Sequence, residues 1–159
     1  MRVLSVVLST VALAAPGSFT LRLDGTTSPV VAGVHVSSLP AATRLLGKPD
    51  RLVACAATWS RYRVSITFAA SSGGCGPWQR MILRSTGWHT RAGLHVGDPA
   101  AKLHALYPDA ATLAFLGPGL WELETGGPLC DGGRPVALAG RVAAGQVTAL
   151  LAVHVPACG

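Results

Sequence analysis

The chain has 159 residues, of which half are hydrophobic and 13% are charged, so its length and composition favour one compact domain with a core of its own. Its net charge is +6, a balance that permits an acidic partner without demonstrating one. The charge is uneven, because residues 44–91 carry eight basic side chains against one acid, whereas residues 92–159 carry three against five. Nucleic acid is not an expected partner, since the sequence contains no nucleic-acid-binding motif.

The first residues have the pattern of a secretory signal peptide. Met1-Arg2 supplies a positive charge, an apolar run follows, and Ala12-Leu13-Ala14 has the small-x-small form of a cleavage site. The alternatives are a retained membrane anchor and a buried first strand, but Pro16-Gly17 interrupts the apolar run well short of the ~20 residues of a spanning helix. We therefore predict a signal peptide over residues 1–14, a single domain over 15–159, and a secreted or extracytoplasmic location without stable membrane insertion.

A five-residue stretch occurs twice and organises the rest of the chain. Ala32-Gly33-Val34-His35-Val36 returns 60 positions later as Ala92-Gly93-Leu94-His95-Val96. Each copy is followed by a capping residue, a short helical pattern and a Pro-Asp pair. Because self-similarity at a fixed spacing indicates repeated structural units, we predict two copies of one unit, over about residues 30–87 and 88–159.

Each unit is expected to begin with a short helix and to continue as antiparallel strands. In the first unit Ser37 or Ser38 caps a helix that ends at Gly47, and in the second Asp98 is the cap and Pro99 the first helical residue. Alternating or β-branched segments predict strands at residues 18–24, 51–58, 62–70, 79–85, 112–116, 120–125, 135–143 and 146–155. The predicted fold class is α+β: two tandem units, each a short helix followed by an antiparallel β-sheet, with the helices on one sheet face.

Four cysteines in an exported chain predict disulfides. Three pairings are open, and the duplication favours one bridge within each unit, Cys55–Cys75 and Cys130–Cys158. The stretch Cys75-Gly76-Pro77-Trp78 begins like a thioredoxin-type redox motif, but a tryptophan stands where the second cysteine would be. A dithiol oxidoreductase is therefore excluded. No two cysteines have the close spacing of a structural zinc site.

The helix and turn motifs of both units resemble a known fold. Leu46-Gly47-Lys48-Pro49 and Leu106-Tyr107-Pro108-Asp109-Ala110, each behind a Gly-x-x-Val stretch, are similar to the repeat of the β-lactamase-inhibitory-protein fold. The small outer-membrane assembly lipoproteins (BamE-like) have a similar unit, and the second unit also resembles small secreted actinobacterial proteins of unassigned function. The resemblance covers about residues 32–155 and implies a concave sheet that grips an enzyme, with one disulfide in each unit. Its motifs concern caps and turns, so they bear on fold more than on function.

Catalytic and metal chemistry find little support in the sequence. His35 and His95 hold equivalent places in the two units, as structural residues do, and no carboxylate or cysteine stands at ligand spacing beside them. Glu122 and Glu124 would share one strand face, but exposed acidic pairs of this kind are common without catalysis. There is no Gly-x-Ser-x-Gly nucleophile elbow. We therefore expect no enzyme activity, no metal and no cofactor.

The strongest functional feature is a set of arginines on two predicted strands. Alternation over residues 61–68 and 79–84 directs the apolar residues to the core and the arginines to the opposite face. The candidate binding residues are Arg61, Arg63, Arg80 and Arg84, with Trp59 beside them. The alternative is a solvated face that keeps a basic protein soluble.

These features favour a secreted, non-enzymatic binding module, inhibitor-like in architecture, that uses an open sheet face to bind an extracellular protein or an acidic envelope polymer. A monomer is expected. The second hypothesis is a cell-envelope-associated protein with a structural or assembly role. The third is a small secreted hydrolase.

Overall fold

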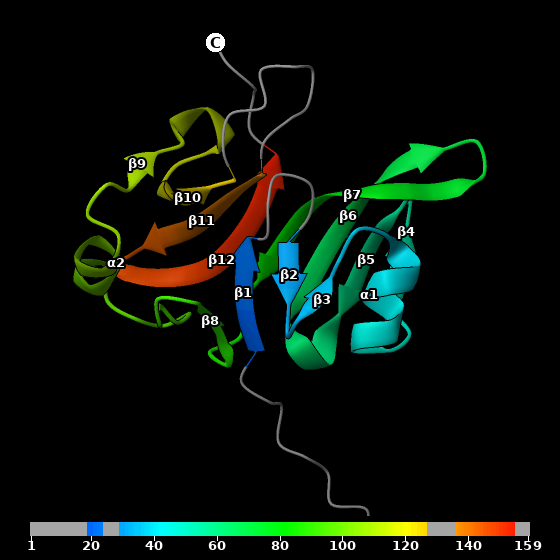
Figure 1. Ribbon diagram of the computed structural model, residues 1–159, viewed down its shortest axis with the longest axis horizontal. Helices are drawn as coiled ribbons and strands as arrows, with labels where there is room; N and C mark the ends of the chain where they lie inside the picture. Colours follow the sequence, from blue (N-terminus) through cyan, green and yellow to red (C-terminus); the bar gives the residue numbers. More distant parts are fainter. Residues whose placement is uncertain (1–18, 24–28, 127–135, 155–159) are drawn as a thin grey trace, which may run out of the picture.

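Two β-sheets form the body of the computed structural model, which describes residues 19–23, 29–126 and 136–154 (Figure 1). The large sheet has eight strands, in the spatial order β4 (Arg51–Val53), β5 (Ala56–Trp59), β6 (Val64–Ser71), β7 (Gly74–Leu83), β12 (Gln146–His154), β11 (Val136–Ala143), β10 (Leu120–Thr125) and β9 (Ala111–Thr112). The small sheet has four, in the order β3 (Val34–His35), β2 (Pro29–Val31), β1 (Phe19–Leu23) and β8 (Trp88–Thr90). The helical elements are α1 (Leu39–Leu46), α2 (Ala100–Leu106) and the 3-10 turns η1 (Ser60–Tyr62) and η2 (Ala114–Leu116).

The large sheet is continuous from one half of the chain to the other. All its neighbouring strands are antiparallel, and at its middle β7 pairs with β12, so that Leu83 lies opposite Leu150. The strand numbers therefore rise from β4 to β7 on one side of this pairing and fall from β12 to β9 on the other. The two halves of the chain share one sheet through a long-range contact that no local pattern specifies.

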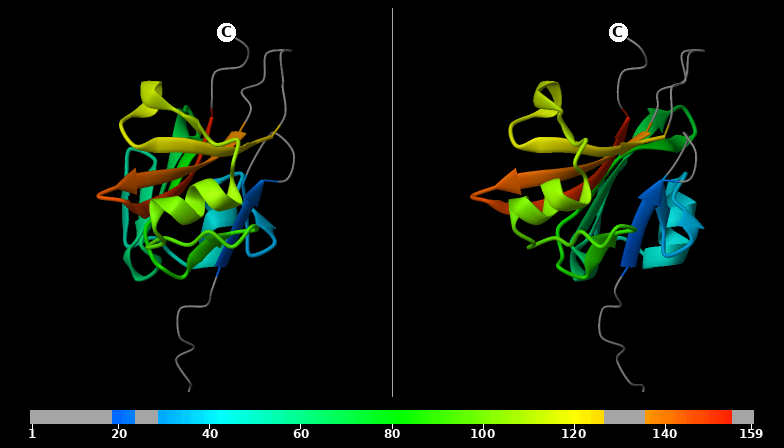
Figure 2. Two further views of the ribbon diagram at one scale, coloured as in Figure 1. Left: turned by 90° about the vertical axis from the view of Figure 1, so that its left-hand side faces the viewer. Right: turned by 60° about the vertical axis from the view of Figure 1, so that its left-hand side comes forward.

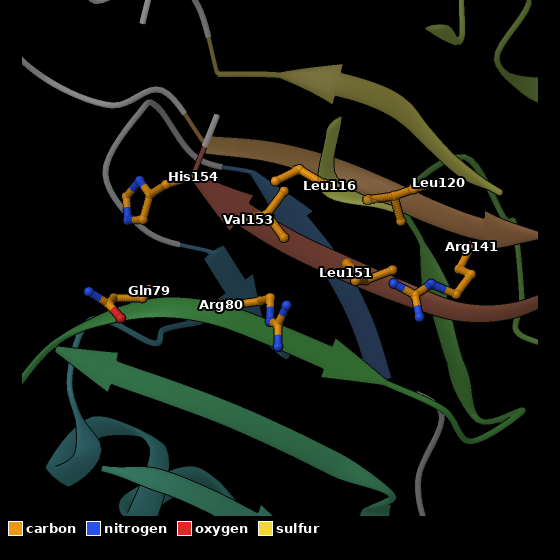
Figure 3. Close-up of a pocket in the computed structure, with 8 residues that line it drawn as sticks. All are labelled: Gln79, Arg80, Leu116, Leu120, Arg141, Leu151, Val153 and His154. Atoms are coloured by element: carbon orange, nitrogen blue, oxygen red, sulfur yellow. The ribbon is translucent and has the colours of Figure 1, made fainter. Parts of the chain in front are cut away.

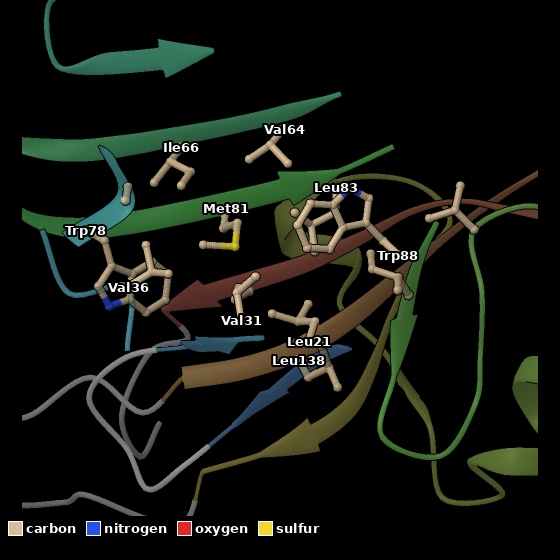
Figure 4. Packing of buried hydrophobic residues seen from close by; sticks show 14 of the residues in the cluster. Leu21, Val31, Val36, Val64, Ile66, Trp78, Met81, Leu83, Trp88 and Leu138 are labelled. Carbon is tan, nitrogen blue, oxygen red and sulfur yellow. The ribbon is translucent and has the colours of Figure 1, made fainter. Parts of the chain in front are cut away.

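The small sheet lies against one face of the large sheet, which we call the inner face (Figures 1 and 2). The main core fills the space between the two sheets. Figure 4 shows Leu21 and Val31 of the small sheet among Met81, Leu83 and Leu138 of the large one, and each of these side chains is at most 2% exposed. Full burial of a side chain of this size stabilises the folded state by about 1.5–3 kcal/mol.

The two helices are short, and each begins at a different kind of cap. Ser38 precedes α1 and accepts a hydrogen bond from the Ala41 N–H at 3.4 Å, which confirms one of the two predicted caps. α2 begins at Ala100, one residue later than predicted, so that Pro99 occupies the cap position and makes no side-chain cap bond. The Asp98 carboxylate instead accepts a hydrogen bond from the His95 N–H at 2.7 Å and stabilises the loop before the helix.

A glycine on β11 brings α2 close to the inner face. A Cβ added at Gly140 would lie 2.9 Å from Cδ1 of Leu103, the buried residue of α2. The missing side chain therefore makes room for the leucine. α1 lies at the other side of the molecule, beside β3 (Figure 1).

The predicted fold class is wrong. The structure is mostly β, with 54% of the described residues in strands and 17% in helices, and not two tandem α+β units with helices packed on a sheet face. The helices, of eight and seven residues, bury only one or two side chains each, so a second sheet is the main cover of the inner face. Residues 19–36 account for much of the difference, because the sequence predicted a single early strand where the chain forms β1, β2 and β3.

Most individual strand predictions are confirmed, with local exceptions. The segment predicted as one strand over 51–58 is divided by a turn at Ala54-Cys55, whose residues have φ values of 46° and 65°. The strand predicted over 62–70 begins only at Val64, since η1 occupies the residues before it. The segment 112–116 is largely the η2 turn.

The predicted Cys55–Cys75 disulfide is confirmed, with a Cα–Cα distance of 5.4 Å. It joins the turn between β4 and β5 to β7 and closes a loop of 20 residues, which stabilises the fold by about 3 kcal/mol in the chain-entropy model. Such a bond indicates an oxidising environment. Cys130, Cys158 and the predicted signal peptide lie outside the described residues. Among the helices of the described segments, none is long and apolar enough to span a membrane.

Candidate functional site

The face of the large sheet turned away from the small sheet, which we call the outer face, can be followed row by row from the strand register. Cross-strand partners share a face. One row runs from Arg51 through Thr58, Ser65, Ile82, Leu151 and Ala139 to Glu122. The next row runs from Val53 through Ala56, Thr67, Arg80 and Val153 to Ala137. The residues between these rows, such as Ile66 and Met81, point to the core.

In the β4–β7 half, the outer face is exposed and basic. Arg51 and Arg80 are exposed, Thr58, Ser65 and Thr67 are half-buried, and the sequence contains no acidic residue between Asp50 and Asp98. The only exposed large apolar side chain in these two rows is Val53, at 53%. This half of the face therefore combines positive charge with hydroxyl groups and needs no apolar cover.

In the β9–β12 half, the outer face is apolar and buried. Leu151, Val153, Ala137 and Ala139 are at most 4% exposed, and they form a second hydrophobic cluster distinct from the main core. Leu113 and Leu120 belong to the same cluster and stand at the two ends of the segment that contains η2. A hydrogen bond of 2.8 Å from the Leu113 N–H to the Leu120 carbonyl closes this segment into a loop, which we call the cover loop (residues 113–120).

The structure brings three of the four candidate arginines to the edge or surface of the β4–β7 half. Arg80 lies in the middle of β7 and Arg84 directly follows the strand, so both continue the alternation with the half-buried Ile82 on the outer face. Arg63 is next to Arg84, because the Arg84 N–H donates to the Arg63 carbonyl at 3.0 Å. All three side chains are exposed. The predicted set of arginines is thus largely assembled by the β6–β7 pairing.

The other two candidate residues lie elsewhere. Arg61 is in η1, where its guanidinium stands 5.5 Å from the ring centre of Tyr62. Trp59 is 2% exposed and its indole N–H donates to the Gly47 carbonyl at 2.7 Å, so it lies in the core and not on the outer face. Its predicted position at a binding surface assumed that a tryptophan beside arginines would be exposed, whereas the register places it opposite the buried Val64.

A pocket lies at the boundary between the open and the covered half of the outer face (Figure 3). It has a volume of about 100 Å³. Leu151 and Val153 contribute apolar surface from β12, and Leu116 and Leu120 contribute it from the cover loop. The polar residues around it are Gln79, Arg80, Arg141 and His154.

Arg141 is the pocket residue that sequence reasoning missed. It ends a run of buried residues on β11, from Val136 to Gly140, and its side chain is half-buried with an Nε atom that has no hydrogen-bond partner. The signal was present in the sequence, because a lone charged residue within an otherwise apolar strand is not explained by core packing. The alternation that predicted the other arginines lies in the first half of the chain.

A buried polar network on the inner side of the molecule has a structural role. The Tyr107 hydroxyl donates to Thr90 Oγ1 at 2.6 Å, and the same oxygen accepts a hydrogen bond from the Leu94 N–H at 3.2 Å. Burial raises the pKa of Tyr107, the bond to Thr90 opposes this shift, and the nearby Glu124 carboxylate adds to it. The phenol therefore stays protonated and ties the end of α2 to β8.

The histidines do not form a metal centre in the described part of the chain. His89 and His95 lie side by side with ring centres 4.9 Å apart, but the described residues contain no group of three potential ligands. The expectation that the protein needs no metal stays a prediction. Glu122, one of the two acids considered for catalysis, accepts a hydrogen bond from Thr125, whereas Glu124 lies beside Tyr107.

No protein-family profile matches the sequence, and neither a curated protein nor a solved structure is found to be similar to it.

Proposed function

We propose that this chain is a secreted binding module without enzymatic activity, and that the outer face of its β4–β7 half binds an acidic surface on an extracellular protein or an envelope polymer. The observation that carries the proposal is the unpaired basic surface around Arg51, Arg80 and Arg84. Within the described residues the only ion pair joins Lys102 to Asp98, far along the chain from these arginines. Their charge is therefore available to a partner.

The chemistry of this face suits association more than catalysis. Arginine side chains make directional hydrogen bonds to carboxylates and phosphates and supply large contact areas, which is why they are enriched in binding surfaces. Exposed charges act mainly on the association rate, and salt weakens their effect. The Cys55–Cys75 disulfide joins two neighbouring parts of this same half of the sheet, and it supports an extracellular location because such bonds persist in oxidising environments.

The test is association with defined acidic probes, namely a polyglutamate peptide and a polyglycerol phosphate, measured by biolayer interferometry. The variant Arg80→Glu/Arg84→Glu should slow association by at least about tenfold at low salt, with both charges reversed on the same face. The control is Arg91→Glu, which reverses one charge at an exposed turn residue directly after β8. Because Arg91 lies outside the outer face, this variant should slow association by much less than half as much, on a logarithmic scale, as the double variant.

The proposal also predicts how salt acts. Association should fall steeply as salt is raised, with the wild-type and the double variant converging at high salt. If both probes bind the double variant as fast as the wild-type, or if Arg91→Glu has the same effect, the outer face is a solubility feature and the contact surface lies elsewhere.

A further inference from the structure

The pocket beneath the cover loop has a composition that neither solubility nor packing explains. Its apolar surface comes from Leu151, Val153 and Leu116, with the guanidinium groups of Arg80 and Arg141 beside it (Figure 3). None of the described residues that line it carries a carboxylate. An apolar surface with positive charge beside it suits a ligand that is apolar along its length and carries a negative group.

The side chain of Arg141 has a hydrogen-bond donor without a partner. The cover loop passes over its guanidinium at Gly117, where an added Cβ would lie 3.9 Å from Nη2. The backbone carbonyl of Arg141 accepts a hydrogen bond from the Thr148 hydroxyl at 3.3 Å, which fixes the strand beneath the side chain. The Nε–H is buried without a partner. That atom is closed to a ligand, but arginine stays protonated, so the Arg141 guanidinium supplies a permanent positive charge to the pocket that it lines.

The size and shape of the pocket narrow the ligand class. Its volume of about 100 Å³ is small, so the pocket encloses only part of a ligand. A carboxylate is planar and pairs well with the Nη donors of a guanidinium group. A larger anion with three or four oxygens would have to replace the apolar contacts to Leu151 and Val153.

We propose that this pocket binds a short aliphatic monocarboxylate, with its carboxylate on Arg141 and its chain on Leu151, Val153 and Leu116. Arg80 supplies a second positive charge to the lining of the pocket. Such a group can be a free short-chain acid or the C-terminal residue of a peptide, and both present the same chemistry. The proposal shares Arg80 with the acidic-surface function proposed above but depends on Arg141, which that function does not use.

The experiment uses hexanoate as the probe and the full exported chain as the protein, with binding followed by isothermal titration calorimetry and ligand-observed NMR. Saturable binding of hexanoate is expected, whereas hexan-1-ol and hexylamine should bind at least about tenfold more weakly, because they lack the charge-assisted acceptor. Arg141→Met keeps the aliphatic part of the side chain and should weaken hexanoate binding at least about tenfold. Arg91→Gln removes the same charge outside the pocket and should leave the affinity unchanged.

A second variant protects the test against loss of folding, since Arg141 is half-buried. Leu116 is 38% exposed and lines the pocket, so the Leu116→Glu variant should fold. Its new carboxylate should compete with the ligand for Arg141 and so weaken hexanoate binding. A peptide ending in leucine identifies the source of the ligand. Tighter binding than hexanoate, lost on C-terminal amidation, indicates a chain terminus, and weaker binding indicates a free acid.

Two results would overturn the proposal. One is the absence of saturable binding by either hexanoate or the free-carboxylate peptide. The other is unchanged affinity in both Arg141→Met and Leu116→Glu. If hexanoate does not bind but polyglutamate still binds in a salt-sensitive manner, the pocket proposal is wrong and the proposed function stands. If hexanoate binds and polyglutamate does not, the proposed function is wrong and the pocket proposal stands.

Discussion

β4–β7 and β9–β12 occupy opposite halves of the same sheet, yet the outer face of the first is exposed and basic whereas that of the second is buried and apolar. The difference is already visible in cross-strand neighbours. Ile82 lies opposite Leu151 in the β7–β12 pairing, and the first is half-buried whereas the second is 2% exposed. A boundary between an open and a covered surface therefore runs along the middle of the sheet.

The cover loop explains the difference. β11 and β12 are apolar on both faces, so one face contributes to the main core and the other needs a second cover. Strands with alternating hydroxyl residues, such as β6, bury one face and expose the other. The covered half gains its stability from burial on both faces, whereas the open half leaves its outer side chains exposed, as the proposed binding function requires.

The largest expected effect comes from breaking the covered half. Leu151→Ala should lower the free energy of unfolding by about 2–5 kcal/mol, because the substitution leaves a cavity under the cover loop. Ile82→Ala, its cross-strand neighbour on the open side of the boundary, should cost about 1 kcal/mol, since the site is already partly solvated. Urea denaturation of both variants with the disulfide intact measures the difference. Equal losses would mean that the two halves are packed alike and that the boundary has no energetic meaning.

A smaller effect is expected from displacing the cover loop itself. Gly119 has φ +67°, and an added Cβ would lie 2.2 Å from the Val142 carbonyl oxygen, so Gly119→Ala must shift the loop. Gly145 in the β11–β12 turn has a similar φ of +77° but nothing within 4 Å, so Gly145→Ala is the matched control for backbone strain alone.

Gly119→Ala should therefore cost about 1–3 kcal/mol more than Gly145→Ala, as forced repacking does. Hydrogen exchange at the Val142 N–H, which donates to the Gly119 carbonyl at 2.7 Å, should become faster only in the first variant. If the two alanines are equally tolerated, the cover loop is not held against β11 at this point.

Local features of the fold could be predicted from the sequence, and its assembly could not. Alternation in β6 and β7 correctly separated Val64, Ile66 and Phe68 from their polar neighbours, because a strand's two faces are set by a period of two. The pairing of β7 with β12 joins strands distant in sequence, and the strand β1 pairs with both β2 and β8. Such contacts depend on tertiary packing and leave no periodic signal in either partner.

The candidate site was predicted in part for the same reason. Arg80 and Arg84 follow from alternation within one strand, and the structure places both at the surface of the outer face. Arg61 does not, because the chain turns into η1 just after β5 and the strand pattern stops there. Trp59 ends β5 on the core face, opposite the buried Val64, so the alternation within β5 buries it. The pocket could not be predicted at all, since it forms only where β7, β12 and β11 meet the cover loop.

The smallest effect concerns the entries to the two helices, which differ between the halves of the chain. α1 is capped by the neutral Ser38, whereas the loop before α2 depends on a carboxylate, Asp98. Burial raises the pKa of Asp98, but the hydrogen bonds from Lys102, at 2.8 Å, and from the His95 N–H lower it, and the net pKa lies below its ordinary value of 3.8. The ionised form is thus favoured by folding.

A carboxyl whose pKa is lowered on folding contributes stability above its unfolded pKa, and that contribution is lost as the pH falls through the folded pKa. Asp98→Asn should therefore cost about 0.5–1 kcal/mol at pH 7, a small value because Lys102 is 41% exposed and solvent screens the pair. The cost should shrink below about pH 3.8, where the unfolded carboxyl is protonated. Ser38→Ala should cost about 1 kcal/mol at both pH values, since a hydroxyl cap does not titrate. Urea denaturation of both variants at pH 7 and pH 3 gives the comparison, and a pH-independent cost for Asp98→Asn would mean that its hydrogen bond to His95, and not its charge, holds the entry to α2.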